Sequence, residues 1–162
     1  MRKIIVIGCP GSGKSTFSRE LSNKTGIPLY HLDMMYWNAD RTTVERSVFL
    51  ERLSDVLGKD SWIIDGNYAS TMELRLAACD TAVFLDYPTE VCLDGIEKRR
   101  GKPRDDIPWV ENELDSEFVE RVVSYNGEQR PKVLELLSKY GDKNIIIFTS
   151  REQADGFLNG YI

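Results

Sequence analysis

The sequence predicts an α/β protein in which helices cover both faces of a parallel sheet. Five short apolar runs rich in β-branched residues alternate along the chain with segments of helical spacing. The length of 162 residues suits one domain with its own core, and 41% hydrophobic and 29% charged residues are typical of a globular protein. We therefore expect residues 1–162 to form a single domain.

Five runs of strand length carry the apolar residues expected of a buried sheet. In chain order they are residues 3–8, 27–33, 61–66, 81–86 and 144–150. The second run ends in polar residues and leads into an irregular stretch rich in aromatic residues and methionine. Ligands of parallel sheets bind at the carboxyl ends of the strands, so one rim should carry the chemistry. That rim is expected to hold the loop after the first strand with His31, Asp33, Asp65, Asp86 and Thr149.

Apolar residues three or four positions apart predict helices between the strands. In chain order these helices end at or near Gly26, Gly58, Ala78, Arg100, Tyr125 and Leu137, and a short one follows Ser150. The helix that ends near Arg100 has Pro88 in its first turn, and the next helix begins at Trp109 after a loop at residues 101–108. Capping boxes are predicted at Thr42 with Glu45, Ser70 with Glu73, and Ser150 with Gln153.

The segment GCPGSGKS, from Gly8 to Ser15, matches the phosphate-binding pattern G-x-x-x-x-G-K-[ST] at every position. It lies between a predicted strand and a predicted helix, which is the setting that this loop requires. Its glycines let backbone N–H groups turn toward a polyphosphate, Lys14 reaches the β- and γ-phosphates, and the Ser15 hydroxyl is placed to bind Mg²⁺. The expected nucleotide contacts are Gly8, Cys9, Pro10, Gly11, Ser12, Gly13, Lys14, Ser15 and Thr16.

Charge and composition argue against several classes of protein. A net charge of −5 is unfavourable for non-specific nucleic-acid binding, so no direct contact with nucleic acid is expected. The sequence has no apolar run near membrane-spanning length and no signal-peptide pattern, which predicts a cytoplasmic protein without a membrane partner. Cys9, Cys79 and Cys92 lack metal-ligand spacing and are expected to be reduced thiols. Cys9 is interpreted as a small residue that fits the loop, with a reactive thiolate as the alternative.

Several motifs together carry a resemblance to a known family. They are the phosphate-binding loop, HLD at 31–33, WIIDGNY at 62–68, RGKPRDD at 100–106 and RPKVLELL at 130–137. With them the chain resembles the adenylate-kinase-like small P-loop kinases, and within these the bacterial DNA topology modulation proteins. The resemblance covers nearly the whole chain. It implies a three-layer P-loop nucleoside-kinase-like fold with a five-stranded parallel sheet of order 2-3-1-4-5, a short lid at about residues 98–108, and the cofactors ATP and Mg²⁺.

The resemblance assigns the metal and the adenine contacts. Asp65 corresponds to the aspartate of the D-G motif, which holds Mg²⁺ through water, and its place after an apolar strand favours the same role. The alternatives are that Asp65 caps a turn or that Asp86 takes the metal. Ser150 and Arg151 correspond to the loop that contacts adenine.

The predicted lid is strongly basic. Phosphoryl transfer needs positive charge at the γ-phosphate, which the planar guanidinium of arginine supplies well. We expect Arg100 and Arg104 to act in catalysis and Arg99 to contact the nucleotide. The alternative is that this run is an ordinary solvated helix end.

The acceptor site is where the sequence distinguishes substrates. Asp33 matches the aspartate that binds the acceptor hydroxyl in related small-metabolite kinases, and such a carboxylate acts as a base. The arginine that grips a nucleoside monophosphate in adenylate kinases is missing after the D-G motif, so Arg46 and Arg75 are the candidate replacements. The expected substrate contacts are His31, Asp33, Arg46, Gly66, Tyr68 and Arg75.

Two kinds of side chain near this site keep two interpretations each. His31 is the only histidine, and a structural role is favoured over catalysis. The aromatic residues Tyr30, Tyr36, Trp37 and Tyr68 either stack on an acceptor ring or close the core under a long loop.

The predicted function is ATP- and Mg²⁺-dependent transfer of the γ-phosphoryl group to a small acceptor, either a nucleoside monophosphate or a hydroxyl-bearing metabolite. The catalytic candidates are Lys14, Arg100, Arg104 and Asp33. The alternative is a nucleotide-dependent regulator of DNA topology or of a partner protein, with little kinase activity. The protein is expected to be a monomer or a weak dimer.

Overall fold

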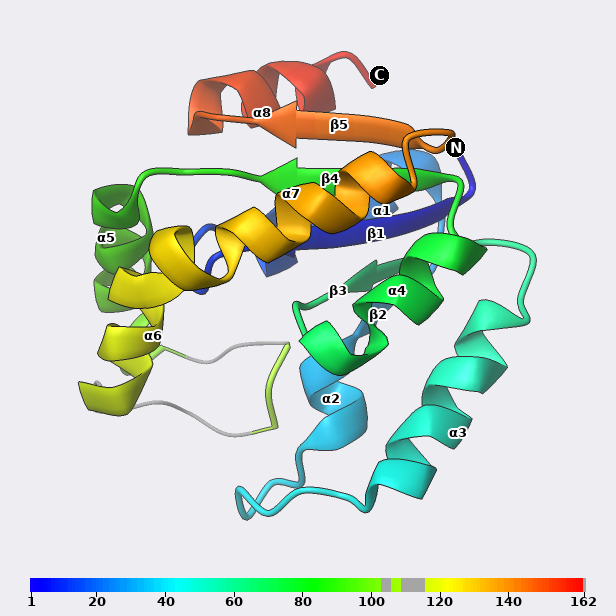
Figure 1. Ribbon diagram of the computed structural model, residues 1–162, viewed down its shortest axis with the longest axis horizontal. Coiled ribbons are helices and arrows are strands. Elements are labelled where there is room, and N and C mark those ends of the chain that lie inside the picture. The colour runs from blue at the N-terminus through cyan, green and yellow to red at the C-terminus, as the bar shows by residue number, and fades with distance from the viewer. Residues whose placement is uncertain (103–105, 109–115, 162) are drawn as a thin grey trace.

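The computed structural model describes residues 1–102, 106–108 and 116–161. Its centre is a five-stranded sheet of order β2-β3-β1-β4-β5 in which every neighbouring pair is parallel (Figure 1). The strands are β1 Lys3–Gly8, β2 Leu29–His31, β3 Trp62–Asp65, β4 Thr81–Leu85 and β5 Asn144–Phe148. The predicted fold class and strand order are confirmed.

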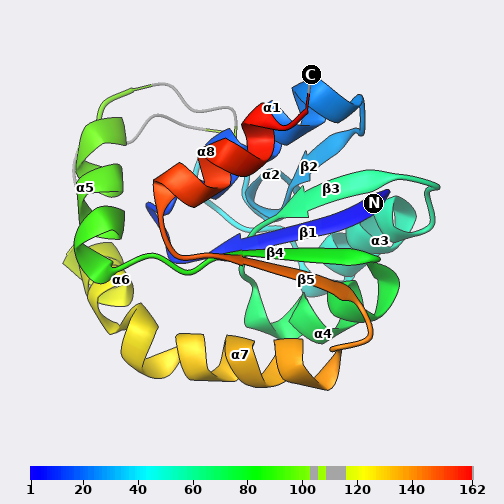
Figure 2. The same ribbon diagram turned by 90° about the horizontal axis from the view of Figure 1, so that it is seen from above.

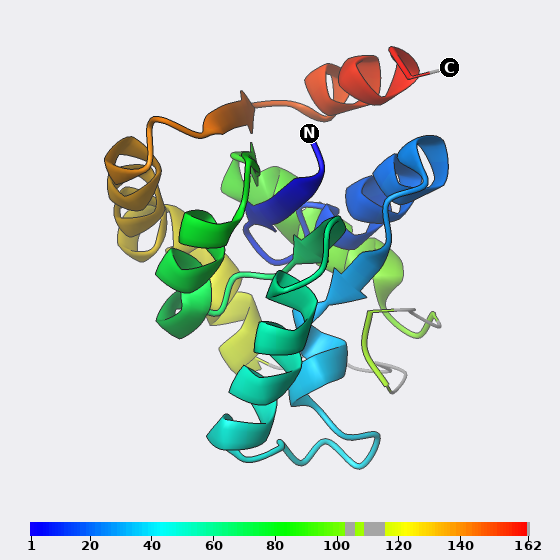
Figure 3. The ribbon, with the colours of Figure 1, turned by 90° about the vertical axis from the view of Figure 1, so that its right-hand side faces the viewer.

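Helices pack on both faces of the sheet, and two more stand beyond the carboxyl ends of its strands. The helices are α1 Lys14–Thr25, α2 Leu32–Tyr36, α3 Arg46–Leu57, α4 Ala69–Ala78, α5 Thr89–Arg99, α6 Ser116–Glu128, α7 Arg130–Lys139 and α8 Arg151–Asn159. Figure 2 shows α1 and α8 on one face, α4 and α7 on the other, and α5 and α6 at the end where β1 and β4 finish. Helices α2 and α3 lie side by side, and the loop that joins them is at one end of the molecule (Figure 3). Among the described residues no helix is long and apolar enough to cross a membrane.

The central strands form the core. Ile4, Ile5, Val6 and Ile7 of β1 are fully buried, as are Trp62, Ile63 and Ile64 of β3. A parallel sheet covered on both faces requires such continuous apolar runs. Strand β5 lies at an edge, and its Ile147 is exposed. The predicted phosphate loop begins at the end of β1, and Asp65 is the last residue of β3. Both therefore lie directly beside this buried core.

The second strand is shorter than expected. It ends at His31, and Asp33 lies in the first turn of the short helix α2 rather than on a strand. Leu32 and Met35 of that helix are buried, and this spacing of three residues places both on one helix face toward the core. The predicted strand over residues 27–33 therefore becomes a short strand followed by one helical turn.

One of the three predicted capping boxes is confirmed. The Ser150 hydroxyl accepts a hydrogen bond from the Gln153 N–H at the start of α8. The box at Thr42 is wrong, because Thr42 bonds to Asp40 within the preceding loop and α3 begins only at Arg46.

The box at Ser70 is also wrong. Helix α4 begins one residue earlier, at Ala69, and Glu73 forms an ion pair with Lys139 of α7. Of the helix predicted from Trp109, the described part begins at Ser116, and residues 109–115 lie outside the described residues.

Candidate active site

The phosphate-binding loop follows β1 and packs directly against the backbone of α5. Gly11 and Gly13 have φ angles of 85° and 94°, which favour glycine. A Cβ added at Gly11 would lie 2.1 Å from the Cys92 carbonyl oxygen, and one added at Gly95 would lie 2.0 Å from the Gly11 carbonyl oxygen. The glycines thus serve two purposes, since they shape the loop and let α5 approach it closely.

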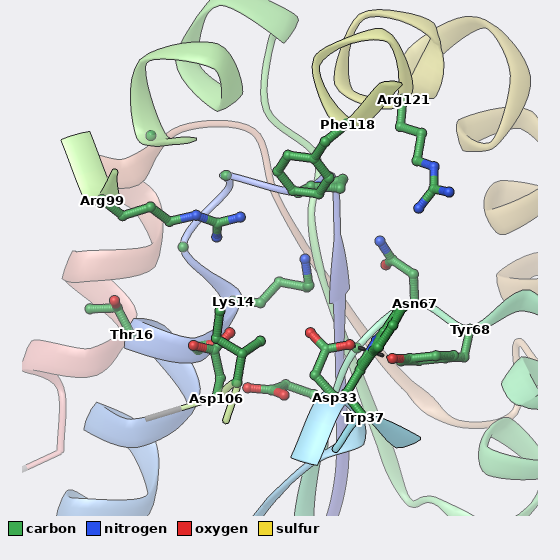
Figure 4. A pocket seen from close by; sticks show the side chains of 18 of the residues that line it. Lys14, Thr16, Asp33, Trp37, Asn67, Tyr68, Arg99, Asp106, Phe118 and Arg121 are labelled. Atoms are coloured by element: carbon green, nitrogen blue, oxygen red, sulfur yellow. Dashed lines mark hydrogen bonds between the residues drawn. The ribbon is translucent and has the colours of Figure 1, made fainter. Parts of the chain in front are cut away.

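Lys14 lies in the centre of a pocket at the carboxyl end of the sheet (Figure 4). Its ammonium group donates hydrogen bonds to the carbonyl oxygens of Gly8, at 3.0 Å, and Cys9, at 3.4 Å. Burial lowers the pKa of Lys14, whereas the charges of Asp65 and Asp33 act in the opposite direction. The two hydrogen bonds hold the Lys14 side chain over the loop.

The pocket around Lys14 has a volume of about 1240 Å³. It exceeds the roughly 300–1,000 Å³ typical of a small-molecule site, which is room for a nucleotide and a small acceptor together. Its lining includes eight basic and four acidic residues. In a chain of net charge −5, this local excess of positive charge suits polyanionic ligands.

The loop residues contribute to this pocket unequally. Those that line it are Pro10, Gly11, Gly13, Lys14, Ser15 and Thr16. Gly8, Cys9 and Ser12 are not among the lining residues. Cys9 is buried, and contact with the Cys92 thiol, together with burial, raises the pKa of Cys9. This environment favours the interpretation of Cys9 as a small residue that fits the loop over that of a reactive thiolate.

Asp65 ends β3, is 4% exposed and lines the pocket. One of its carboxylate oxygens lies 2.7 Å from Nδ1 of His31. Burial alone would lower the pKa of His31, but the hydrogen bond and the charge of Asp65 outweigh it, and the pKa is raised. His31 itself does not line the pocket, so its role as an acceptor contact is not supported. It holds the Asp65 carboxylate instead.

Asp86, the other metal candidate, has a different partner. It forms a two-point ion pair with Arg130, with N···O distances of 2.8 and 2.9 Å. Asp86 does not line the pocket, and neither does Thr149, whose backbone N–H donates to the side chain of Gln153. Fewer of the residues predicted at the rim of the sheet line the pocket than the sequence analysis expected.

Asp33 and Tyr68, two of the expected acceptor contacts, line the pocket, and Asp33 lies close to Lys14 (Figure 4). The Tyr68 hydroxyl donates a hydrogen bond to Asp33. Burial raises the pKa of Asp33, while the hydrogen bond from Tyr68 and the charge of Lys14 limit the rise. The result is a carboxylate with a fixed orientation and more than ordinary basicity.

The WIIDGNY motif is explained by the turn that follows β3. Gly66 has a φ of 131°, and a Cβ there would lie 2.9 Å from the side chain of Leu32. The Asn67 amide donates to the Gly8 carbonyl oxygen at 2.7 Å and accepts from the Gly8 N–H at 3.2 Å. Asn67 thus ties the acceptor side to the phosphate loop. The sequence analysis assigned it no role, although its place in the motif was a usable signal.

Arg75 corrects a prediction. It is fully buried, and its guanidinium donates to the carbonyl oxygens of Gly66, Asn67 and Tyr68. A side chain committed to three carbonyls inside the protein does not grip a substrate phosphate. The other candidate, Arg46, is exposed, bonds to Ser70 at 3.4 Å and does not line the pocket.

The predicted lid arginines also differ in whether they line the pocket. Arg99 lines the pocket, and its guanidinium lies over the Phe118 ring at 5.6 Å. Arg100, expected to be catalytic, pairs instead with Glu97 at 3.0 Å and does not line the pocket. Helix α5 ends at Arg99, so the backbone leaves the helix at Arg100 and its side chain takes another direction. Arg104 lies outside the described residues.

Of the two predicted adenine contacts, only one lines the pocket. Arg151 does so and donates hydrogen bonds to the carbonyl oxygens of Ser12, at 2.9 Å, and Gly11, at 3.3 Å. It therefore braces the phosphate loop from α8. Ser150 is the N-cap of that helix and does not line the pocket.

The pocket residues that the sequence analysis did not select include Asp106 and Arg121. Asp106 is 7% exposed and accepts a hydrogen bond from the Ser15 hydroxyl at 2.9 Å. Arg121 of α6 is exposed, and Figure 4 shows Arg99 and Arg121 approaching Lys14 from opposite sides. The place of Asp106 in the RGKPRDD motif was a usable signal, although the cations of that motif were the residues predicted to act.

The oxygen donors of the pocket are of the kind that binds a magnesium ion. Ser15, Asp65 and Asp106 line the same pocket, and oxygen is the ligand that Mg²⁺ prefers. No group of three or more His, Cys, Asp or Glu side chains within the described parts of the chain is arranged to hold a metal by itself.

Comparisons with known proteins agree with this architecture. A family model described as AAA domain matches residues 4–120. A shikimate kinase structure from Bacteroides thetaiotaomicron superposes with a TM-score of 0.60 and 19% identity, covering 97% of this chain and 94% of that one. A shikimate kinase from Acinetobacter baumannii in complex with shikimate gives 0.64 and 16%, covering 99% and 90%. No curated protein sequence matches the chain. At these identities the structural likeness is one of fold, and the resemblance to DNA topology modulation proteins stays a prediction.

Proposed function

The chain belongs to the AAA domain family, and from that premise we propose that it is an ATP- and Mg²⁺-dependent phosphotransferase whose acceptor is a small hydroxyl-bearing molecule. The complete phosphate-binding motif and the fold shared with shikimate kinases support nucleotide-dependent phosphotransfer in general. The choice of acceptor rests on this chain's own residues.

The observation that carries the choice is the environment of Asp33. A hydroxyl loses a proton as it attacks the γ-phosphate, and a carboxylate within hydrogen-bond reach accepts that proton. Asp33 lines the pocket beside Lys14, is oriented by Tyr68 and has a raised pKa because of burial. These are the properties of a general base for an alcohol.

A nucleoside monophosphate is the less favoured acceptor. Its phosphate is already anionic and needs an arginine clamp rather than a base. The guanidinium of Arg75 is already hydrogen-bonded to backbone carbonyl oxygens, and Arg46 does not line the pocket. Neither of these two arginines supplies the clamp, so a monophosphate would have to be held by other pocket arginines such as Arg41 or Arg121.

The aromatic residues form a wall of the acceptor side. Tyr36 packs edge-on against Tyr68 and Phe49, with ring centroids 5.3 Å apart in each pair. Tyr36, Trp37 and Tyr68 also line the pocket. Their packing favours the core-closing interpretation for Tyr36 and Tyr68, and the exposed parts of the rings leave an apolar surface for the acceptor.

The remaining roles follow from charge and position. The loop N–H groups and Lys14 hold the phosphates, and Arg99 brings a further positive charge to the pocket. Ser15 and Asp65 would hold Mg²⁺, which, when bound, neutralises charge on the β- and γ-phosphates. His31 would keep the Asp65 carboxylate oriented toward that site.

The test is ADP release from Mg-ATP in the presence of separate acceptors: hydroxylated metabolites, nucleosides, nucleoside monophosphates, duplex DNA, or none. We expect stimulation by a hydroxylated small molecule and its loss in Asp33→Asn. The matched control is Asp94→Asn, because Asp94 is an exposed partner of Lys98 on α5. Stimulation by nucleoside monophosphates that survives Asp33→Asn would contradict the proposed acceptor. A response to duplex DNA alone would favour the regulatory alternative.

A further inference from the structure

We propose that Asp106 is a positioning residue for Mg²⁺ that acts through the hydroxyl group of Ser15. The inference rests on the nucleotide binding included in the proposed function. It adds to the metal site a carboxylate from the loop between α5 and α6, 91 residues away in sequence from the serine that it contacts.

The geometry of one hydrogen bond carries this inference. The Ser15 hydroxyl donates its only hydrogen to Oδ2 of Asp106 at 2.9 Å. A hydroxyl oxygen has one hydrogen and two lone pairs, so fixing the hydrogen also fixes the direction of the lone pairs. Ser15 is the residue of the phosphate-binding motif whose oxygen binds the metal. Asp106 therefore orients the ligand atom without having to touch the ion.

Asp65 and Asp106 line the same pocket as Ser15 but have different partners, and this difference separates their roles. Asp65 lies on a rigid central strand and its carboxylate is held by His31. The hydrogen bond from Ser15 goes to Asp106. Outer groups of this kind fix ligand orientation in metal sites, and their loss costs affinity although they are not ligands themselves.

Burial of Asp106 supports a role that involves a cation. Its side chain is only 7% exposed and lines a pocket that also holds Asp33 and Asp65. The negative charge of Asp106 contributes to the raised pKa of Asp33, so the carboxylates repel one another. Buried like charges are costly unless a cation compensates them. Lys14 supplies one such charge, and Mg²⁺ carried by the nucleotide would supply more.

The experiment measures how strongly Mg²⁺ tightens nucleotide binding. The dissociation constant of a non-hydrolysable ATP analogue is determined by calorimetry, once with Mg²⁺ and once with EDTA, and the ratio of the two constants is compared among variants. Asp106→Ala removes both the charge and the acceptor of the Ser15 hydrogen bond. Asp106→Asn keeps an acceptor oxygen but removes the charge. Asp94→Ala is the matched control, because Asp94 is exposed on α5 and pairs with Lys98.

We expect the ratio of EDTA to Mg²⁺ dissociation constants to fall about tenfold in Asp106→Ala, the size of one charge-assisted hydrogen bond. The ratio should fall less in Asp106→Asn and stay unchanged in Asp94→Ala. Without Mg²⁺, Asp106→Ala should bind the analogue as well as the wild type or better, because a negative charge near the phosphates is gone.

Several results would overturn the inference. An unchanged ratio in Asp106→Ala, or equal weakening of binding with and without Mg²⁺, would mean that Asp106 only anchors its loop. A wild-type ratio near one would also exclude a metal role. Failure of the proposed kinase function gives a different result: nucleotide binding keeps its dependence on Mg²⁺ and on Asp106, but no acceptor is phosphorylated.

Discussion

The two halves of the pocket are built in different ways. The nucleotide half comes from one continuous segment, Gly8–Thr16, and its binding groups are mainly backbone N–H groups and Lys14. The acceptor half is assembled from separate elements: Asp33 from α2, Tyr68 from the turn after β3, and Arg121 from α6. A change in the first half should therefore affect every substrate alike, whereas a change in the second should affect the choice of acceptor.

The largest effect is expected from Lys14→Ala. Loss of this preorganised charge should reduce phosphoryl transfer by about 10³-fold with any acceptor, while the fold stays intact. The measurement is ADP formation, with the melting temperature as the control for folding. Lys139→Ala is the matched variant, because Lys139 is 62% exposed, pairs with Glu73 and does not line the pocket. Equal turnover in Lys14→Ala and the wild type would show that the loop does not serve catalysis.

Asp33→Asn tests the acceptor half. We expect kcat/KM for the hydroxylated acceptor to fall by about 10²-fold, because the base is lost, while nucleotide affinity changes little. Only the ionised carboxylate accepts a proton, so wild-type activity should fall as the pH drops through the pKa of Asp33. Burial raises that pKa, which places the fall above the ordinary value of about 3.9. A pH profile whose acid limb persists in Asp33→Asn would assign the limb to another group.

Gly95→Ala tests whether contact with α5 shapes the nucleotide half. The new Cβ would lie 2.0 Å from the Gly11 carbonyl oxygen, and both groups belong to backbone. We expect a loss of about 1–3 kcal/mol in the free energy of unfolding and weaker nucleotide binding. The measurements are denaturant unfolding and calorimetry.

The matched control for this change is Gly156→Ala. Gly156 lies inside α8 with nothing within 4 Å of an added Cβ, so the same substitution should stabilise the protein by up to about 1 kcal/mol. Equal effects at Gly95 and Gly156 would mean that the close approach of α5 to the loop has no energetic consequence.

The smallest effect is expected from Arg121→Gln. Arg121 is exposed at the edge of the pocket, so its loss should raise the KM for an anionic acceptor by a few-fold, roughly the strength of an exposed ion pair. Arg100→Gln should change the KM less, because Arg100 pairs with Glu97 outside the pocket lining. Both KM values are measured by steady-state kinetics. A larger rise in KM for Arg100→Gln than for Arg121→Gln would mean that Arg100, as first predicted, is the arginine that acts in the site.

The sequence was a good guide wherever function depends on backbone and on continuous segments. The phosphate-binding motif and the parallel sheet were predicted from glycine spacing and apolar periodicity, which act locally. The strand order was predicted from the family resemblance. The capping signals were weaker guides. A favourable serine or threonine needs the helix to start directly after that residue, and two of the three helices start elsewhere.

Only the tertiary structure decided which side chains reach the pocket. Arg99 and Arg100 are neighbours in sequence, but only Arg99 lines the pocket, whereas Arg100 pairs with Glu97. Arg75 looked like a substrate clamp and is instead committed to buried carbonyls.

The contact between Ser15 and Asp106 is the clearest example of this limit, because it joins residues 91 positions apart. The sequence by itself determined a phosphate-binding loop at the end of a parallel sheet, since that geometry is encoded in a few consecutive residues. It did not determine the partners of Ser15, Asp65 or Arg75. Those partners depend on where distant elements meet, and packing of the whole chain fixes that.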